Sequence, residues 1–291
     1  MSDPINFEIE ALVARYELHP ERRDVFVEGE SDQGLVRTFL DRRGLRNISV
    51  LSVAVVNVPP ASVLNRALPH PSRRSEVIAL AFELEGRGVS LRQVACIADA
   101  DLEFVLPQNL ACSLLLLTDY ASMELYAFSP EAVQNVLFVV SPKTEKSGSD
   151  LVADLTGPLE FLFAVQATNF DLQFKLAWIK SIEKFFSIKA GRIKFDEKEF
   201  RERYITIHLS PERLKQFEVR LKEISSIVCS DARRRIRGHD FVKLLAWYLR
   251  KSEKCTHLNE DAVRQMLYVG TGPEQLASEA TFSSLLDRLA P

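Results

Sequence analysis

The chain has 291 residues, of which 46% are hydrophobic and 26% are charged, a composition typical of a globular protein with one large domain or two smaller ones. The formal net charge of -3 excludes a chain-wide basic field, so any nucleic acid must be held by a local patch or through a metal ion. The four scattered cysteines show no Cys-x-x-Cys spacing, and they predict reduced, structural thiols in a cytoplasmic protein.

Three further classes of segment are not expected. The opening residues Met1 to Pro4 lack the charged and apolar regions of an export signal. The longest apolar-rich stretch, residues 159–186, is interrupted by charged side chains and is therefore not expected to cross a membrane. The pattern G-x-x-x-x-G-K-[ST] does not occur, so any nucleotide hydrolysis would need another protein.

The first half of the chain alternates short apolar runs with helical periodicity. Strands are predicted over residues 24–27, 48–58, 93–98 and 113–117. Helical spacing is found at Leu35, Val36, Phe39 and Leu40, before Gly44, and again at Val77, Leu80, Ala81 and Leu84. This alternation predicts an α/β fold with a parallel sheet flanked by helices.

A polar run over residues 141–150 is the predicted linker between a first domain, 1–140, and a mainly α-helical C-terminal domain, 151–291. Ser129 and Pro130 are predicted to open a helix just before this linker. Three-to-four spacing predicts further helices over 176–186 and 214–224, and another is predicted over 241–250.

Acidic side chains follow two of the predicted strands. Glu28 comes directly after strand 24–27, and Asp99 and Asp101 follow strand 93–98. The carboxyl ends of parallel strands meet at one edge of a sheet, where these acids would repel each other unless a cation were present. We therefore predict a centre for Mg²⁺ or Mn²⁺ held by Glu28, Asp99 and Asp101, with Asp32 and Glu124 as further ligands.

Each part of this pattern also has a structural interpretation. Glu28 and its neighbours are compatible with an acidic turn in which Asp32 caps a helix, and Asp99 and Asp101 with a solvated loop. Glu124 is equally compatible with an exposed position on a helix.

One short basic run stands out in the second half. Arg233, Arg234, Arg235 and Arg237 precede the helix predicted over 241–250, and arginines in this pattern bind phosphates through paired hydrogen bonds. The alternative is a solvated face or a docking site for an acidic partner. His239 is expected to orient the backbone or to pack near Asp240 rather than to bind a metal.

The order apolar-Val-Glu-Gly-x-x-Asp, then apolar-x-Asp-x-Asp, resembles the TOPRIM domain of topoisomerases, DnaG-type primases and OLD-family nucleases. Glu28 matches the acid of that family, Gly29 its turn glycine, and Asp99 with Asp101 its paired aspartates. Asp99 lies 71 positions after Glu28, which leaves room for the intervening helix, strand and helix. The resemblance implies that Glu28 is the catalytic residue, acting as general acid or base.

A wider resemblance covers roughly residues 20–255. The segments 118–126, 180–185 and 237–241 are similar to stand-alone bacterial TOPRIM proteins of the PARIS anti-phage type. In that family an ABC-type ATPase encoded alongside the TOPRIM protein senses infection and releases a nuclease that cleaves host tRNA. The resemblance implies the same ATPase partner, a tRNA substrate, a homo-oligomer as the active form and no membrane association.

Metal-dependent phosphodiester cleavage is thus the leading hypothesis. The alternatives are a non-catalytic regulatory docking module for the ATPase and a DNA-cleaving nuclease of the OLD type. Topoisomerase or primase chemistry is disfavoured, because neither a large tyrosine-bearing domain nor a zinc-binding segment is visible. A basic residue usually accompanies the acids in OLD-like nucleases, and spacing leaves that role open among Arg37, Arg73, Arg74 and Arg92.

Overall fold

The computed structural model describes residues 6–64 and 72–289, and the chain divides into two compact units. The first unit holds residues 1–100, 109–119 and 272–291, and the second holds 101–108 and 120–271. This division differs from the predicted domains 1–140 and 151–291, because residues 101–108 and 120–140 belong to the second unit and the end of the chain returns to the first. The opening segment Met1 to Pro4 lies outside the described residues.

A four-stranded parallel sheet forms the centre of the first unit and confirms the predicted α/β class. Its order is β3 (Ser49–Ser52), β2 (Asp24–Val27), β5 (Val94–Ala98) and β6 (Leu115–Leu117). Every neighbouring pair is parallel, and Phe26 of β2 lies opposite Cys96 of β5. Because β2 and β5 are adjacent, the residues that follow them leave the same edge of the sheet.

The strand predicted over 48–58 is only partly formed. After β3 the chain makes a 3-10 turn, Val53–Val55, in which Ser52 Oγ accepts the N–H of Ala54. The last part, β4 (Val56–Asn57), pairs with β1 (Phe7–Glu8) in a separate two-stranded sheet. The Ser52 hydroxyl accepts a backbone N–H in place of a neighbouring strand, so one apolar run is divided into two short strands.

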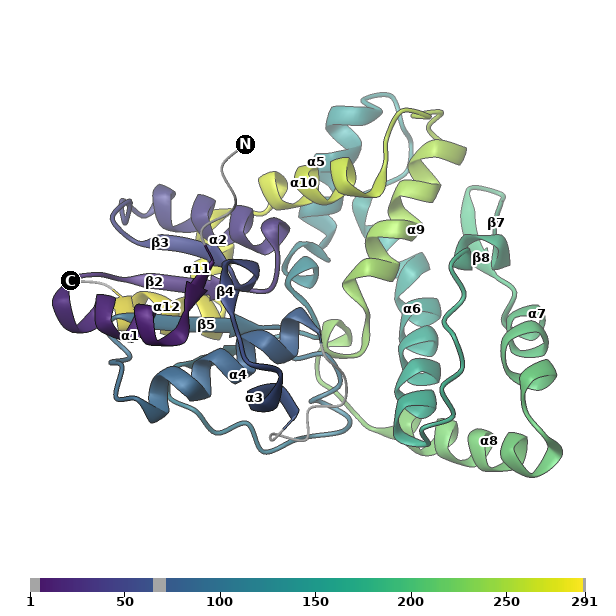
Figure 1. Ribbon diagram of the computed structural model, residues 1–291. Coiled ribbons are helices and arrows are strands. Elements are labelled where there is room, and N and C mark those ends of the chain that lie inside the picture. Colours follow the sequence, from purple (N-terminus) through teal and green to yellow (C-terminus); the bar gives the residue numbers. More distant parts are fainter. Residues whose placement is uncertain (1–5, 65–71, 290–291) are drawn as a thin grey trace. The chain divides into compact units, whose positions relative to one another are not determined.

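Helices cover both faces of the sheet (Figure 1). The helices of the first unit are α1 (Ile9–Leu18), α2 (Glu30–Arg42), α3 (Pro60–Leu64), α4 (Arg73–Gly86), α11 (Pro273–Ala277) and α12 (Ala280–Leu289). The two helices predicted before Gly44 and near Gly86 are confirmed as α2 and α4. Gly44 has a φ of +79°, the left-handed geometry that glycine adopts readily after a helix.

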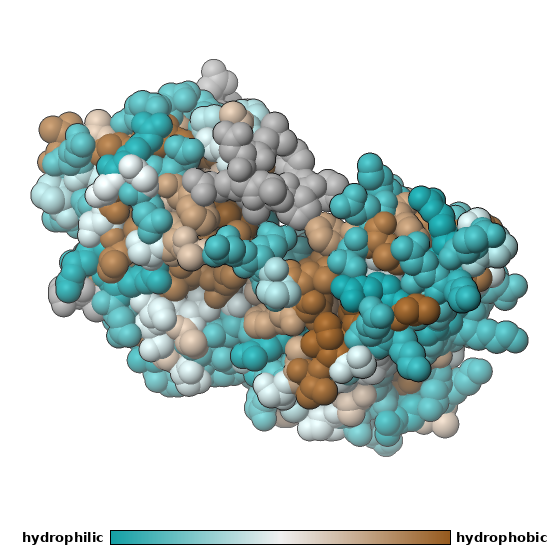
Figure 2. All heavy atoms as spheres, turned by 90° about the horizontal axis from the view of Figure 1, so that it is seen from below, coloured by the Kyte–Doolittle hydropathy of each residue, from teal (hydrophilic) through white to brown (hydrophobic). Residues whose placement is uncertain are grey.

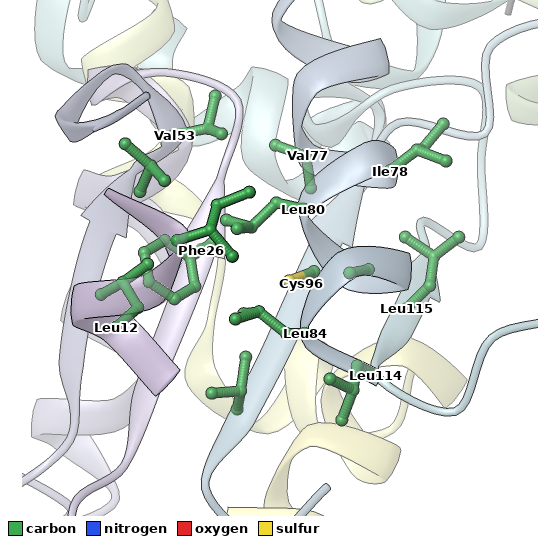
Figure 3. Packing of buried hydrophobic residues seen from close by; sticks show 14 of the residues in the cluster. Leu12, Phe26, Val53, Val77, Ile78, Leu80, Leu84, Cys96, Leu114 and Leu115 are labelled. Atoms are coloured by element: carbon green, nitrogen blue, oxygen red, sulfur yellow. The ribbon is translucent and has the colours of Figure 1, made fainter. Parts of the chain in front are cut away.

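One face of the sheet packs against α1 and α4. Leu12, Phe26, Leu80, Leu84 and Cys96 belong to a single buried cluster there, and Figure 3 shows them lying together between the helices and the strands. All five side chains are fully buried. Burial raises the pKa of the Cys96 thiol, in keeping with a structural role, and all four cysteines of the chain are free.

The opposite face is covered by α2 and by α12, which comes from the far end of the chain. Phe39 of α2 and Phe282 of α12 pack edge to face with their ring centroids 4.8 Å apart. Asp119, just after β6, accepts the N–H of Thr281 through Oδ2 at 3.0 Å, and Thr281 Oγ1 donates to Leu117 O at 2.7 Å. The C-terminal helix is therefore a part of the α/β unit.

We predict that Phe282→Ala lowers the free energy of unfolding by about 3–5 kcal/mol, because Phe282 is fully buried against Phe39. The matched control is Phe138→Ala, the same change at a side chain that is 70% exposed, where the loss should stay below about 0.5 kcal/mol. Urea unfolding followed by circular dichroism measures both. Equal losses for the two variants would contradict the role given to α12.

The second unit is mainly helical. Its α-helices are α5 (Pro130–Val140), α6 (Gly148–Asp171), α7 (Glu197–Phe200), α8 (Pro211–Ser226), α9 (Gly238–Lys251) and α10 (Glu260–Gly270), with one antiparallel hairpin of β7 (Phe186–Lys189) and β8 (Arg192–Phe195). The shorter helical turns are Met123–Ala127, Ile182–Phe185, Arg201–Ile205, Thr206–His208 and Ala232–Arg235. The helix opening at Ser129 is confirmed, since Ser129 Oγ accepts the N–H of Ala132.

The run 141–150, predicted as a linker, lies wholly inside the second unit. Thr144 Oγ1 donates to Glu253 Oε1 at 3.0 Å, and Ser147 Oγ caps α6 by accepting the N–H of Asp150 at 3.1 Å. Polar composition suggested a solvated connection, but these side chains hydrogen-bond to the protein instead.

The helix predicted over 176–186 is wrong. The segment contains the short turn Ile182–Phe185 and then enters β7. Positive φ angles at Gln173 and Lys175 break the helical geometry between α6 and this segment, and Phe185 within it is buried against the ring of Phe200. Four apolar residues at helical spacing were too few to distinguish the two outcomes. The helices predicted over 214–224 and 241–250 are confirmed as α8 and α9.

The view in Figure 2 shows mostly hydrophilic side chains over α8, whose apolar residues Phe217, Leu221 and Ile224 are buried. Among the described residues, no helix is both long and apolar enough to cross a lipid bilayer.

A buried carboxylate ties the β7–β8 hairpin to α6. Asp154 Oδ2 contacts Lys146 Nζ at 2.9 Å and accepts the N–H of Ile193 at 3.0 Å, while Oδ1 lies 2.6 Å from Arg192 Nε. Burial alone would raise the pKa of Asp154, but the hydrogen bonds and the two cationic groups lower it below the ordinary value of 3.8.

The lowered pKa predicts a stabilising contribution that is present above pH 3.8 and is lost as the pH falls toward the folded-state pKa. Between about pH 5 and about pH 3, the wild type should therefore lose stability more steeply than Asp154→Asn. The control is Asp287→Asn, at an exposed aspartate, which should keep the wild-type slope. Thermal unfolding across this pH range measures the difference, and parallel slopes for wild type and Asp154→Asn would contradict it.

Candidate metal centre

Two of the predicted acids meet at the carboxyl edge of the parallel sheet. Glu28 directly follows β2, and Asp99 directly follows β5. Glu28 Oε1 accepts the backbone N–H of Asp99 at 2.8 Å. The strand pairing thus brings together two residues that lie 71 positions apart in the sequence.

The backbone around this pair is held on several sides. Arg74, in the first turn of α4, donates from Nε to Asp99 O at 2.7 Å and from Nη2 to Ala100 O at 3.4 Å. Thr118 Oγ1 accepts the N–H of Ala100 at 2.9 Å. The loop after β5 is therefore fixed through its peptide groups.

Helix α2 begins directly after Glu28. Its N-cap is Gly29, so the interpretation of Asp32 as the cap is not supported, and Asp32 lies half-buried in the first helical turn. Gly29 has an extended backbone with a φ of -146°, and a Cβ added there would have no atom within 4 Å. The local geometry does not require glycine, so the predicted turn role of Gly29 has no basis in its backbone conformation.

Asp101 follows two residues after Asp99 and belongs to the second unit. Its φ is +50°, an uncommon value that aspartate tolerates better than most residues, and its N–H donates to Ala121 O at 2.8 Å. The side chain is exposed.

Glu124, the last predicted ligand, lies in the second unit and is only 6% exposed, so the alternative of an exposed helical glutamate is wrong. Its Oε1 lies 3.3 Å from Arg264 Nε and 3.5 Å from His239 Nδ1. Burial alone would lower the pKa of Arg264, but Glu124 and Asp261 raise it above its ordinary value. A Cβ at Gly238 would overlap Glu124, so a glycine lets α9 begin against this carboxylate.

The arginine run makes contacts inside the second unit. Arg233 Nη2 lies 2.7 Å from Asp231 Oδ2, and Arg235 Nη2 lies 2.6 Å from Glu160 Oε1. Arg237 donates to Gln166, and the Arg234 guanidinium lies 5.0 Å from the centre of the Phe104 ring. Arginines with these partners hold helices and turns together, and phosphate binding by this run stays a prediction.

The four arginines considered for the basic role beside the acids have different contacts in the structure. Arg37 donates to Val50 O at 3.3 Å, Arg73 pairs with Glu76 at 2.6 Å, and Arg92 precedes β5 at the opposite edge of the sheet. Arg74 alone among these four contacts the loop that carries Asp99. The positions of Arg74 and Thr118 in the sequence gave no sign that these residues contact the loop that carries Asp99.

The donor chemistry of Glu28 and Asp99 suits a magnesium ion, which prefers oxygen ligands and needs only one or two protein carboxylates besides water and a substrate phosphate. No group of three or more His, Cys, Asp or Glu side chains close enough to bind a metal is found in residues 6–64 and 72–289.

No protein-family model matches this chain, and no curated protein matches its sequence.

We predict that Arg74→Gln lowers the free energy of unfolding by about 1–3 kcal/mol, because two carbonyl groups lose a charged donor. Amide hydrogen exchange at residues 99–101 should also become faster. The control is Arg73→Gln on the neighbouring position, where an exposed ion pair is lost and the change should stay within about 0.5 kcal/mol. Unchanged exchange at residues 99–101 would show that Arg74 does not fix the loop.

Proposed function

We propose that this protein is a magnesium- or manganese-dependent TOPRIM-type endonuclease. The observation that carries the proposal is the contact between Glu28 and the Asp99 amide at the carboxyl ends of two adjacent parallel strands. Functional groups of open α/β sheets gather at this edge. Acidic oxygens there are suited to a divalent ion and, through it, to a phosphodiester.

The proposal gives each residue a separate task. Glu28 and Asp99 would hold the ion, and Asp32, on the first turn of the helix that follows Glu28, is placed in the same unit. Asp101 and Glu124 belong to the second unit, and a part for them in the centre stays a prediction. When bound, a divalent ion would stabilise charge on the scissile phosphate and lower the pKa of an attacking water.

Glu28 would act as general acid or base in addition to binding the ion. Its Oε1 is oriented by the Asp99 N–H, so the carboxylate is held in one direction before any substrate arrives. Arg74 would act as a positioning residue, since it contacts the backbone of Asp99 and Ala100. A preorganised carboxylate of this kind contributes to rate because no reorientation is needed in the transition state.

The biological role rests on the resemblance to PARIS-type TOPRIM proteins. On that basis the chain is the toxic effector of an anti-phage system, is held and released by an ABC-type ATPase, and cleaves host tRNA as a homo-oligomer. The acids support the chemistry, and the resemblance supports the substrate and the partner.

The test compares wild type with Glu28→Gln, a change that keeps an oxygen to accept the Asp99 N–H. Purified protein is incubated with total tRNA and with supercoiled plasmid in the presence of Mg²⁺ or Mn²⁺. The same variants are expressed briefly in cells together with the neighbouring ATPase and a phage trigger. We expect discrete tRNA fragments from the wild type and at least a hundredfold less cleavage by Glu28→Gln, the order lost with a general acid or base.

The control is Glu30→Gln, which removes an exposed acid two residues away and should keep wild-type cleavage. Both variants should retain the wild-type melting temperature. Plasmid nicking without tRNA fragments would reassign the protein to the DNA-cleaving OLD type. Absence of any cleavage, with co-purification of the ATPase, would replace the nuclease proposal by a non-catalytic docking module.

A further inference from the structure

Strand β7 of the second unit is an open sheet edge. The sheet has two strands, and the only strand neighbour of β7 within the described chain is β8. The outer edge of β8 is covered, because the N–H of Ile193 donates to Asp154 of helix α6. An uncovered edge presents unpaired backbone groups and is a ready template for another strand.

The register shows which groups of β7 point outward. Residues Ala190 and Gly191, both with positive φ, form the two-residue turn, and Lys189 pairs with Arg192 beside it. The next pair is Ile188 with Ile193, and the outward N–H of Ile193 marks it as a pair whose peptide groups face away from each other. Neither the N–H nor the C=O of Ile188 makes a hydrogen bond within residues 6–64 and 72–289.

A groove of about 610 Å³ runs along this edge. Its residues are Glu183, Lys184, Phe186, Ser187, Ile188, Trp247 and Lys251, so β7 forms one wall and the end of α9 forms the other. Phe186 and Trp247 provide an apolar floor, with ring centroids 6.2 Å apart. The groove therefore combines backbone groups that can pair with a strand and a surface that can bury an apolar side chain.

The charged residues that line the groove indicate which kind of strand it can bind. Lys184 and Lys251 line the groove with exposed ammonium groups, and Lys189 stands exposed at the end of β7. The one acidic residue of the groove is Glu183, whose buried Oε2 has no hydrogen-bond partner within the described residues.

We propose that β7 and the groove beside it bind an extended segment of a partner protein in which acidic and apolar residues alternate. The segment adds a strand to β7 through the N–H and C=O of Ile188. Its apolar side chain packs on Phe186 and Trp247, and its carboxylates face the lysines. This interaction is independent of the acids that follow β2 and β5.

The test uses fluorescein-labelled eight-residue peptides in which valine alternates with glutamate, titrated with the full chain and followed by fluorescence anisotropy. The matched probes alternate valine with lysine, or carry N-methyl groups on alternate backbone amides of the acidic peptide. We expect the acidic peptide to bind at least tenfold more tightly than either matched probe. Equal binding of the N-methylated peptide would overturn strand addition, and no binding of any peptide would overturn the site.

Two protein variants and one control variant complete the test. Ile188→Pro removes the outward N–H at an edge position where proline is tolerated, and it should weaken binding at least tenfold. Lys184→Glu with Lys251→Glu should reverse the preference toward the lysine peptide, whereas Lys215→Glu with Lys222→Glu, exposed on α8, should leave it unchanged. If the wild type instead forms a dimer that Ile188→Pro abolishes, the occupant is a second copy of this chain and the partner proposal is wrong.

Discussion

The candidate centre depends on the parallel pairing of β2 with β5. This pairing sets Asp24 opposite Val94 and Phe26 opposite Cys96, so the two strands end within one residue of each other at the same edge of the sheet. The contact of Glu28 with the Asp99 amide follows from that register. The register in turn requires apolar helices on both faces, and one of these, α12, is supplied by the last residues of the chain.

In the second unit, buried charged side chains pair with groups of opposite charge. Glu124 is enclosed by Arg264 and His239, Asp154 by Lys146 and Arg192, and Arg235 reaches Glu160. Buried charges persist when they are paired, and these pairs fix helices and the hairpin in place. The edge of β7 is the contrasting feature, because within the described residues β8 is its one strand neighbour, and Lys184, Lys251 and Glu183 line the groove beside it.

Sequence reasoning was most successful where periodicity is long and apolar. It predicted strand 24–27 and the helices that became α2, α4 and α8, and it placed Glu28 and Asp99 at strand ends. It failed where tertiary contacts decide: the return of α12 to the sheet, the ordered run 141–150, and the hairpin in place of a helix after residue 176. Arg74 was one of four equal candidates, because a hydrogen bond to a distant carbonyl leaves no mark in local spacing.

We propose that Glu28 and Asp99 together hold a divalent metal ion. The most direct measurement is a crystal structure of the whole chain grown with Mn²⁺, with the anomalous signal of manganese used to locate the ion. We expect an anomalous peak in contact with carboxylate oxygens of both Glu28 and Asp99. A peak bound elsewhere while this pair holds none, or no peak at millimolar Mn²⁺, would contradict it.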